Sequence, residues 1–224
     1  SRQRKPLIDA GTLHDLSLDL MGDLFEGITT PLKDIARFRD GLAIGMLLHA
    51  PARVGNFAHI RIGRELHKIG DRYRIDVPKE QVKNRQALSY WLGGWLTPFI
   101  DRYIEEIRPA LALRKGRWAR DGAQDWFWLS ESGGPLGPSR LSLRVARRVE
   151  AATGLRLGAH QFRSVAATTI ALEDPEHAGM IRAALGHASM RTSEMHYNMA
   201  DSASAAISYH AVLTALKKDD DPHG

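Results

Sequence analysis

The chain has 224 residues, with 31 Lys and Arg against 26 Asp and Glu, which gives a formal net charge of +5. It has no Cys, so disulfides, zinc–thiolate sites, iron–sulfur clusters and cysteine nucleophiles are excluded. No apolar run approaches the ~20 residues of a membrane span, and no signal peptide is recognisable. We therefore expect a cytoplasmic globular protein without a membrane partner. Because the first residue is Ser1 and not Met, we expect either a fragment or a processed chain.

The first half of the sequence predicts two helices followed by a small sheet. Apolar residues recur at helical spacing from Leu13 to Phe25, and again from Thr30-Pro31 to His49. Three segments then alternate and are rich in β-formers: 57–62, 73–77 and 87–92. We predict three short antiparallel strands, the last two joined by a polar hairpin over 78–86.

The second half is predominantly helical. A helix is predicted after Thr97-Pro98, a short buried segment at 126–129, and a Gly- and Pro-rich loop at 130–138. Another helix is expected from Ser139, which we take as its N-cap, and a further one near His160. The predicted fold class is α+β, mainly α: a helical bundle with a small three-stranded antiparallel sheet.

A basic stripe marks the helix predicted from Ser139. Arg140, Arg144 and Arg148 are spaced four residues apart, and Arg147 joins them. A stripe of this kind is typical of a solvated surface helix. It is also what a helix lying on nucleic-acid phosphates requires, because such interfaces depend on Lys and Arg.

Several residues suited to chemistry recur along the chain in a fixed order. They are Arg53 after the second helix, Lys83 in the hairpin, His160 and Arg163 three apart, His187 in Leu-Gly-His, and Tyr197. Each is unremarkable alone. A His-x-x-Arg pair is commonly a surface pair, Leu-Gly-His is commonly a helix C-cap, and Tyr197 suits a packing position. The ordered set with these spacings is more informative.

In that order and spacing, the chain resembles the catalytic domain of the tyrosine recombinases, the phage integrase family. The resemblance runs from about Pro31 to Tyr197, and its specific part is 160–197. It implies an arm or linker with the first helix over 1–30, a catalytic domain over 31–200, and a C-terminal helix with a disordered acidic tail over 201–224. That helix is expected either to dock on a neighbouring protomer or to pack on its own domain.

The resemblance also implies roles for single residues. Tyr197 would attack a DNA phosphate and form a 3′-phosphotyrosyl link, while Arg53 and Arg163 clamp the non-bridging oxygens. Lys83 would protonate the leaving 5′-oxygen. His160 would help to accept the tyrosine proton or hold the phosphate, and His187 would hydrogen-bond the phosphate. Candidate DNA contacts are Arg85, Arg140, Arg144 and Arg147.

These roles are consistent with the chemistry of phosphoryl transfer, which depends on positioning and on stabilising charge at the equatorial oxygens. Arg suits that task, because its planar fork donates two bonds and keeps its charge. No metal or other cofactor is expected, and the chain lacks the G-x-x-x-x-G-K-[ST] motif of nucleotide-binding loops. The expected partner is double-stranded DNA bound by a homotetramer, with a monomer for the isolated fragment.

Two departures from the family pattern accompany the resemblance. Asn56 stands three residues after Arg53, where the family often carries an acid, and too few residues precede Pro31 for the family's separate DNA-binding domain. The alternatives are a type IB topoisomerase-like enzyme and a DNA-binding relative that does not cleave. A zinc hydrolase is disfavoured, because the chain has no H-E-x-x-H. Bacterial or phage origin, and action on chromosomal DNA in integration of a mobile element, are expectations from the family alone.

Overall fold

The structure, a computed structural model, describes residues 8–22, 32–82, 85, 87–113 and 125–165. Its helices in chain order are α1 (Ala10–Gly22), α2 (Leu32–His49), α3 (Val54–Ala58), α4 (Thr97–Arg102), α5 (Arg108–Leu113) and α6 (Pro138–Thr153). Its strands are β1 (Leu66–Ile69), β2 (Arg72–Val77) and β3 (Leu88–Trp91). The predicted fold class, mainly helical with a three-stranded antiparallel sheet, is confirmed.

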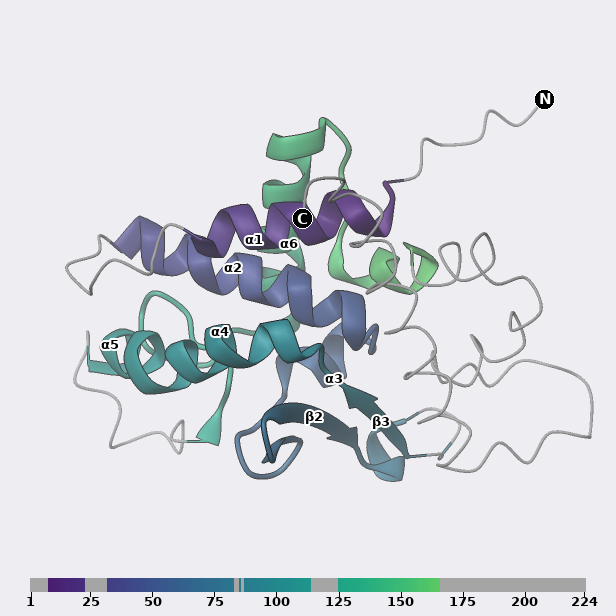
Figure 1. Cartoon of the computed structure of the whole chain (residues 1–224), viewed down its shortest axis with the longest axis vertical. Helices are drawn as coiled ribbons and strands as arrows, with labels where there is room; N and C mark the ends of the chain where they lie inside the picture. The colour runs from purple at the N-terminus through teal and green to yellow at the C-terminus, as the bar shows by residue number, and fades with distance from the viewer. Residues whose placement is uncertain (1–7, 23–31, 83–84, 86, 114–124, 166–224) are drawn as a thin grey trace, which may run out of the picture.

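Helix α2 is the centre of the helical layer, with α1 along one side and α4 and α5 along the other (Figure 1). Nearly all of α2 from Ile35 onward is buried, as its apolar sequence requires. Two glycines let α1 approach closely: a Cβ on Gly41 would lie 2.7 Å from the Cβ of Leu20, and one on Gly45 would lie 2.6 Å from Oγ of Ser17. Ser17 completes the contact by donating to the carbonyl of Gly41 at 2.9 Å. Both predicted helices are confirmed over the described residues, and the parts predicted at 23–25 and 30–31 lie outside them.

The sheet has the order β1-β2-β3, with both neighbouring pairs antiparallel. In β2, buried Tyr73, Ile75 and Val77 alternate with half-buried residues, so one face of the strand is turned to the core. The strands predicted over 73–77 and 87–92 are confirmed by β2 and β3.

The strand predicted over 57–62 is wrong. Phe57 and Ala58 end helix α3, whose first turn closes with a bond from the amide of Phe57 to the carbonyl of Arg53 at 3.0 Å. The alternation in this segment arises because Phe57 turns inward against Trp128, with ring centroids 5.2 Å apart, and Ile60 is also buried. The outer strand is Leu66–Ile69 instead.

A second helical run and a buried segment complete the core. Helix α4 continues through a π-helical turn (Tyr103–Ile107) into α5, which confirms the helix predicted after Thr97-Pro98. Phe127, Trp128 and Leu129 are fully buried, as predicted for this segment. The amide of Leu129 donates to the hydroxyl of Tyr103 at 3.2 Å and fixes the segment to the π-helical turn.

Helix α6 begins one residue earlier than predicted. Pro138 occupies its first turn, where a missing N–H costs nothing, and Gly137 is the N-cap. Ser139 is therefore not the N-cap, and no side chain caps this end. Leu141, Val145 and Val149 form the buried stripe that was expected. The helix ends at Thr153, and the following Gly154 caps it with a φ of 72°, the left-handed conformation that favours glycine.

Candidate active site

Arg53 lies at the junction between α2 and α3. Pro51 follows the last turn of α2, and Arg53 adopts an extended conformation as the N-cap of α3, with φ −60° and ψ 138°. Its side chain is half-buried and has no hydrogen bond or ion pair with any residue that the structure describes. The backbone thus holds the Cα of Arg53 in place while its guanidinium is available for a ligand.

Arg163 comes from a distant part of the sequence and is held in place by the residues before it. A 3-10 turn, η6 (Ala159–Gln161), precedes it, and the amide of Gly158 donates to Oε1 of Gln161 at 2.7 Å to close that turn. The amide of Ala159 donates to Oγ of Ser142 at 3.2 Å, which ties the turn to α6. Nη1 of Arg163 then donates to the carbonyl of Pro51 at 2.8 Å. This bond joins residues 112 positions apart and brings Arg163 to the segment that carries Arg53.

The charges of Arg53 and Arg163 act on one another and on Tyr90 in β3. Burial lowers the pKa of Arg163, the nearby Tyr90 hydroxyl opposes that change, and the charge of Arg53 adds to it. Burial raises the pKa of Tyr90, whereas the charges of Arg163 and Arg53 act in the opposite direction. Two cations therefore act on one buried phenol, and their combined charge favours the binding of an anion beside them.

The hairpin between β2 and β3 supplies the other wall of the site. An open pocket is lined by Arg53 together with Lys79, Glu80, Gln81, Val82 and Arg85. Asn56 connects the two walls, because its Nδ2 donates to the carbonyl of Gln81 at 3.2 Å. Arg85, a predicted DNA contact, is exposed at the edge of this pocket and has a φ of 56°.

His160 is exposed in η6, three residues before Arg163. The remaining predicted catalytic residues, Lys83, His187 and Tyr197, lie outside the described residues. The structure thus brings Arg53, Arg163 and the hairpin together.

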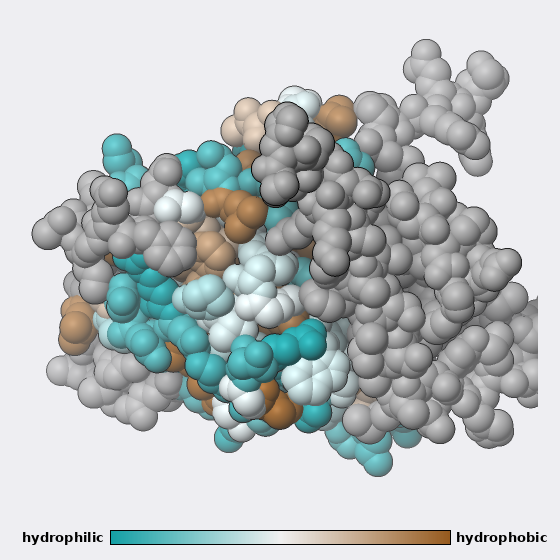
Figure 2. All heavy atoms as spheres, viewed as in Figure 1, coloured by the Kyte–Doolittle hydropathy of each residue, from teal (hydrophilic) through white to brown (hydrophobic). Residues whose placement is uncertain are grey.

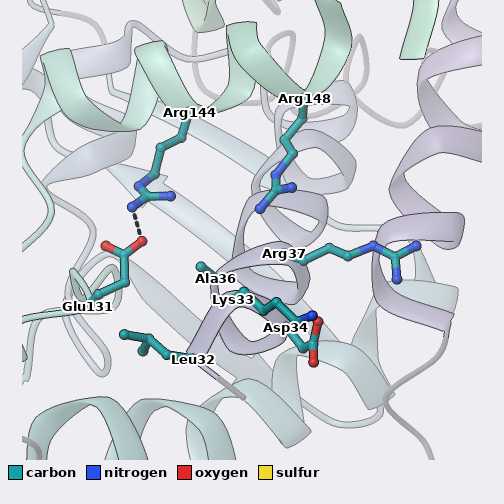
Figure 3. A pocket seen from close by; sticks show the side chains of 8 residues that line it. All are labelled: Leu32, Lys33, Asp34, Ala36, Arg37, Glu131, Arg144 and Arg148. Atoms are coloured by element: carbon teal, nitrogen blue, oxygen red, sulfur yellow. Dashed lines mark ion pairs between the residues drawn. The ribbon is translucent and has the colours of Figure 1, made fainter. Parts of the chain in front are cut away.

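Two arginines of α6, Arg144 and Arg148, line a pocket together with Arg37 and Glu131 (Figure 3). Arg140 and Arg147 are exposed, whereas Arg144 pairs with Glu131 and lies 3.6 Å from Oδ2 of Asp40. The structure thus places Arg144, a predicted DNA contact, in internal ion pairs, and its DNA role stays a prediction.

Asp40 is the buried centre of a network that the sequence analysis missed. Nε of Arg148 donates to its Oδ2 at 3.0 Å, and Nη2 of the fully buried Arg39 donates to its Oδ1 at 2.8 Å. The available signal was the Arg39-Asp40 pair, which lies next to the apolar run that begins at Leu42. Tyr90 was also missed, because strand alternation predicts its burial but not its neighbours.

The remaining described surface offers few competing sites. In the view of Figure 2, hydrophobic residues form separate spots among hydrophilic ones, and the exposed large ones are Ile69, Leu113 and Leu143. Within the described ranges, no helix is long and apolar enough to cross a membrane. The same ranges contain no group of three or more His, Asp or Glu side chains arranged to hold a metal ion.

Comparison with solved structures identifies the fold as that of the tyrosine site-specific recombinases. The chain is similar to XerH site-specific recombinase bound to difH substrate in a pre-cleavage complex, with a TM-score of 0.56 and 17% identity over 98% of the chain. It is similar to the XerH post-cleavage complex with palindromic difH, with a TM-score of 0.54 and 18% identity over 96% of the chain. The match to XerA recombinase has a TM-score of 0.57 and 13% identity over 99% of the chain.

The chain spans 53% and 52% of the two XerH chains and 68% of the XerA chain. No protein-family model and no curated protein sequence matches it. The likeness is therefore one of fold, and the predicted recombinase fold is confirmed at that level.

Proposed function

We propose that this chain is the catalytic part of a site-specific recombinase that cleaves and rejoins double-stranded DNA through a 3′-phosphotyrosyl link, without metal or ATP. The observation that carries the proposal is the convergence of Arg53 and Arg163, joined through Pro51, in a recombinase fold. The family resemblance of the sequence singles out the same two arginines.

The two arginines suit a scissile phosphate. A diester phosphate carries one negative charge in the ground state and spreads further charge over its oxygens as the nucleophile attacks. Arg163 is anchored to Pro51 through Nη1, while Arg53 approaches from the N-terminus of α3. Fixed cations in a partly dry site stabilise such charge more strongly than mobile ones in water.

The remaining roles follow the family pattern. Tyr197 attacks the phosphorus and displaces the 5′-oxygen, which takes a proton from Lys83. His160 accepts the tyrosine proton or holds the phosphate, and His187 hydrogen-bonds a phosphate oxygen. The free 5′-hydroxyl of a partner duplex then attacks the phosphotyrosine, so rejoining needs no ATP.

DNA binding is assigned to exposed cations around the same site. Arg85 borders the pocket beside Arg53, and Arg140 and Arg147 project from α6. Four protomers assemble on paired DNA arms in the complete reaction, and the isolated fragment is a monomer. The protein is of bacterial or phage origin and acts inside the cell on chromosomal DNA.

Covalent trapping tests the proposal. The chain is incubated in EDTA with a library of nicked suicide duplexes and separated on a denaturing gel, with Tyr197→Phe as the control. A DNA-linked band that disappears in the variant supports the proposal, and sequencing the trapped DNA gives the site. A band that survives the substitution would overturn the nucleophile. If no band forms with the complete protein, a DNA-binding protein that does not cleave replaces the recombinase proposal. Relaxation of supercoiled plasmid that does not depend on a site would indicate a topoisomerase instead.

A further inference from the structure

Tyr90 has a buried hydroxyl group that the described structure leaves without a hydrogen bond. The residue is 1% exposed, and its Oη has no hydrogen-bond partner. A buried hydroxyl that lacks a partner costs stability, so native proteins seldom keep one unless it has another use. A phenylalanine would fill the same space without that cost.

The position of Tyr90 in the sheet is fixed independently of its hydroxyl. Tyr90 is paired with Ile75 of β2, and Leu92, two residues further on, donates its amide to the carbonyl of Tyr73 at 2.9 Å. The backbone of Tyr90 is therefore held by the sheet, and the burial of its side chain restricts the ring.

The hydroxyl lies within the electrostatic reach of both site arginines. The charges of Arg163 and Arg53 each act on it, and such an effect between single groups fades quickly with distance. Arg53 is the more available of the two, because its guanidinium has no hydrogen bond among the described residues, whereas Arg163 is bonded to Pro51. An arginine can only donate and a phenol oxygen can accept, so the two groups are chemically matched.

Tyr90 is poorly suited to be a second nucleophile. Burial raises the pKa of its hydroxyl, so the phenolate is disfavoured, and its 1% exposure denies a DNA strand access to the oxygen. A neutral, fixed acceptor behind the arginines is the role that remains.

We propose that Tyr90 is a positioning residue, whose hydroxyl oxygen accepts an N–H of Arg53 when a phosphate binds and so holds that guanidinium in line with the phosphate oxygens. This inference rests on the proposed function and acts through Arg53, without contact between Tyr90 and the DNA. It explains why a buried, unbonded hydroxyl is present at this point of β3.

The test compares Tyr90→Phe with Tyr73→Phe, the same substitution on the neighbouring strand. The hydroxyl of Tyr73 donates to Oδ1 of Asp101 at 2.7 Å, so its removal breaks a bond that exists in the described structure. Tyr90→Phe is expected to raise Tm by about 2–4 °C, because an unpaired buried hydroxyl is lost, whereas Tyr73→Phe lowers it. A fall in Tm for Tyr90→Phe would overturn the assignment of its hydroxyl as unbonded.

Cleavage is measured in a single turnover at saturating DNA. Tyr90→Phe is expected to slow formation of the covalent complex about five- to twentyfold while DNA affinity changes less than about twofold, and Tyr73→Phe leaves the rate unchanged. In an Arg53→Lys background, Tyr90→Phe should cause little further loss, because both changes remove one interaction. A wild-type rate for Tyr90→Phe, or fully additive losses, would overturn the proposal.

A binding measurement keeps this inference separate from the proposed function. Inorganic phosphate is titrated while Tm is followed, first in the wild type and in Arg53→Ala to establish that the site binds it. Tyr90→Phe should weaken the phosphate affinity about fivefold even if the wild type forms no covalent complex. An unchanged phosphate affinity, or none in the wild type, would refute the positioning role, whereas a cleavage failure alone would refute the recombinase proposal.

Discussion

Arg163 donates a hydrogen bond from Nη1 to the carbonyl of Pro51, at 2.8 Å. Pro51 lies two residues before Arg53, so this bond links the segments that carry the two arginines. The guanidinium that makes this structural link is also a proposed phosphate ligand. The contact ties the segment that carries Arg163 to the backbone two residues before Arg53.

The two arginines should therefore differ in what they contribute to folding. Arg163→Ala is expected to slow cleavage about 10²- to 10³-fold and to lower the free energy of unfolding by about 1–3 kcal/mol, because it removes a charged donor from a buried carbonyl. Arg53→Ala should slow cleavage as much, with a stability change below about 0.5 kcal/mol. Urea unfolding measures the stability of the two variants, and single-turnover cleavage measures their rates. Equal stability losses would contradict the difference in bonding.

Asn56 should be specific for an amide. Its Nδ2 donates to the carbonyl of Gln81, and an aspartate would instead place an acceptor against that carbonyl. We expect Asn56→Asp to loosen the hairpin, speed hydrogen exchange of the Gln81 and Val82 amides, and slow cleavage about fivefold. Asn56→Ala, which lacks the repulsion, should have a smaller effect. Faster cleavage by Asn56→Asp would show instead that an acid here orients Arg53, as the family pattern suggests.

Asp40 should contribute strongly to folding. Its carboxylate is 1% exposed and accepts bonds from buried Arg39 and from Arg148. Removing one partner of a buried ion pair leaves the other charge uncompensated, so Asp40→Asn should lower the free energy of unfolding by about 3–5 kcal/mol. The matched control is Asp19→Asn, because Asp19 pairs with Arg37 at 3.3 Å at the surface, and it should cost less than about 1 kcal/mol. If urea unfolding shows a similar loss of stability for Asp40→Asn and Asp19→Asn, the buried network around Asp40 is not a major contribution to folding.

The exposed and the ion-paired arginines of α6 should be separable by salt dependence. Arg140→Ala and Arg147→Ala are each expected to weaken DNA binding and to reduce the slope of log K against log salt by about 0.9, with little change in Tm. Arg148→Ala should lower Tm and leave the slope unchanged, because its guanidinium is engaged by Asp40. An unchanged slope for both exposed arginines would place the DNA elsewhere.

Asp101 should make stability depend on acid. Burial alone would raise the pKa of Asp101, but the bonds from Lys68 and Tyr73 outweigh it and lower the pKa below 3.8. A carboxyl group with a lowered folded-state pKa stabilises the fold above its unfolded pKa, and that contribution is lost as the pH falls through the folded value. Asp101→Asn should therefore reduce Tm at pH 7 and have little effect near pH 2. An equal reduction at both pH values would show that the charge is not responsible.

The sequence predicted the parts of the fold in which periodicity reflects burial. The alternation in 73–77 and the stripe of Leu141, Val145 and Val149 both have one buried face, so pattern and structure agree. The segment 57–62 misled because a short helix and a buried turn leave Phe57 and Ile60 inward at strand-like spacing. Five residues are too few for helical periodicity to be distinguished from alternation.

Site residues could be predicted only where they belong to the ordered set of residues that the recombinase family shares. Arg53 and Arg163 were singled out by that order, and the fold brings them together. Neither Tyr90 nor the Asn56 bond could be predicted, because each depends on which residues the chain places opposite one another. The roles of Lys83, His187 and Tyr197 stay predictions, since those residues lie outside the described ranges.

The close crossing of α1 over Gly41 and Gly45 bears on how the catalytic unit can be exchanged between proteins. A Cβ at either glycine would meet Leu20 or Ser17 of α1, so both positions must stay small for α1 to lie this close. A chimera joined at residue 31 would leave this contact to an unrelated helix and bare part of α2 to water. The junction should therefore lie before Ile8. The chimera would then keep α1, which covers α2, the helix that precedes Arg53.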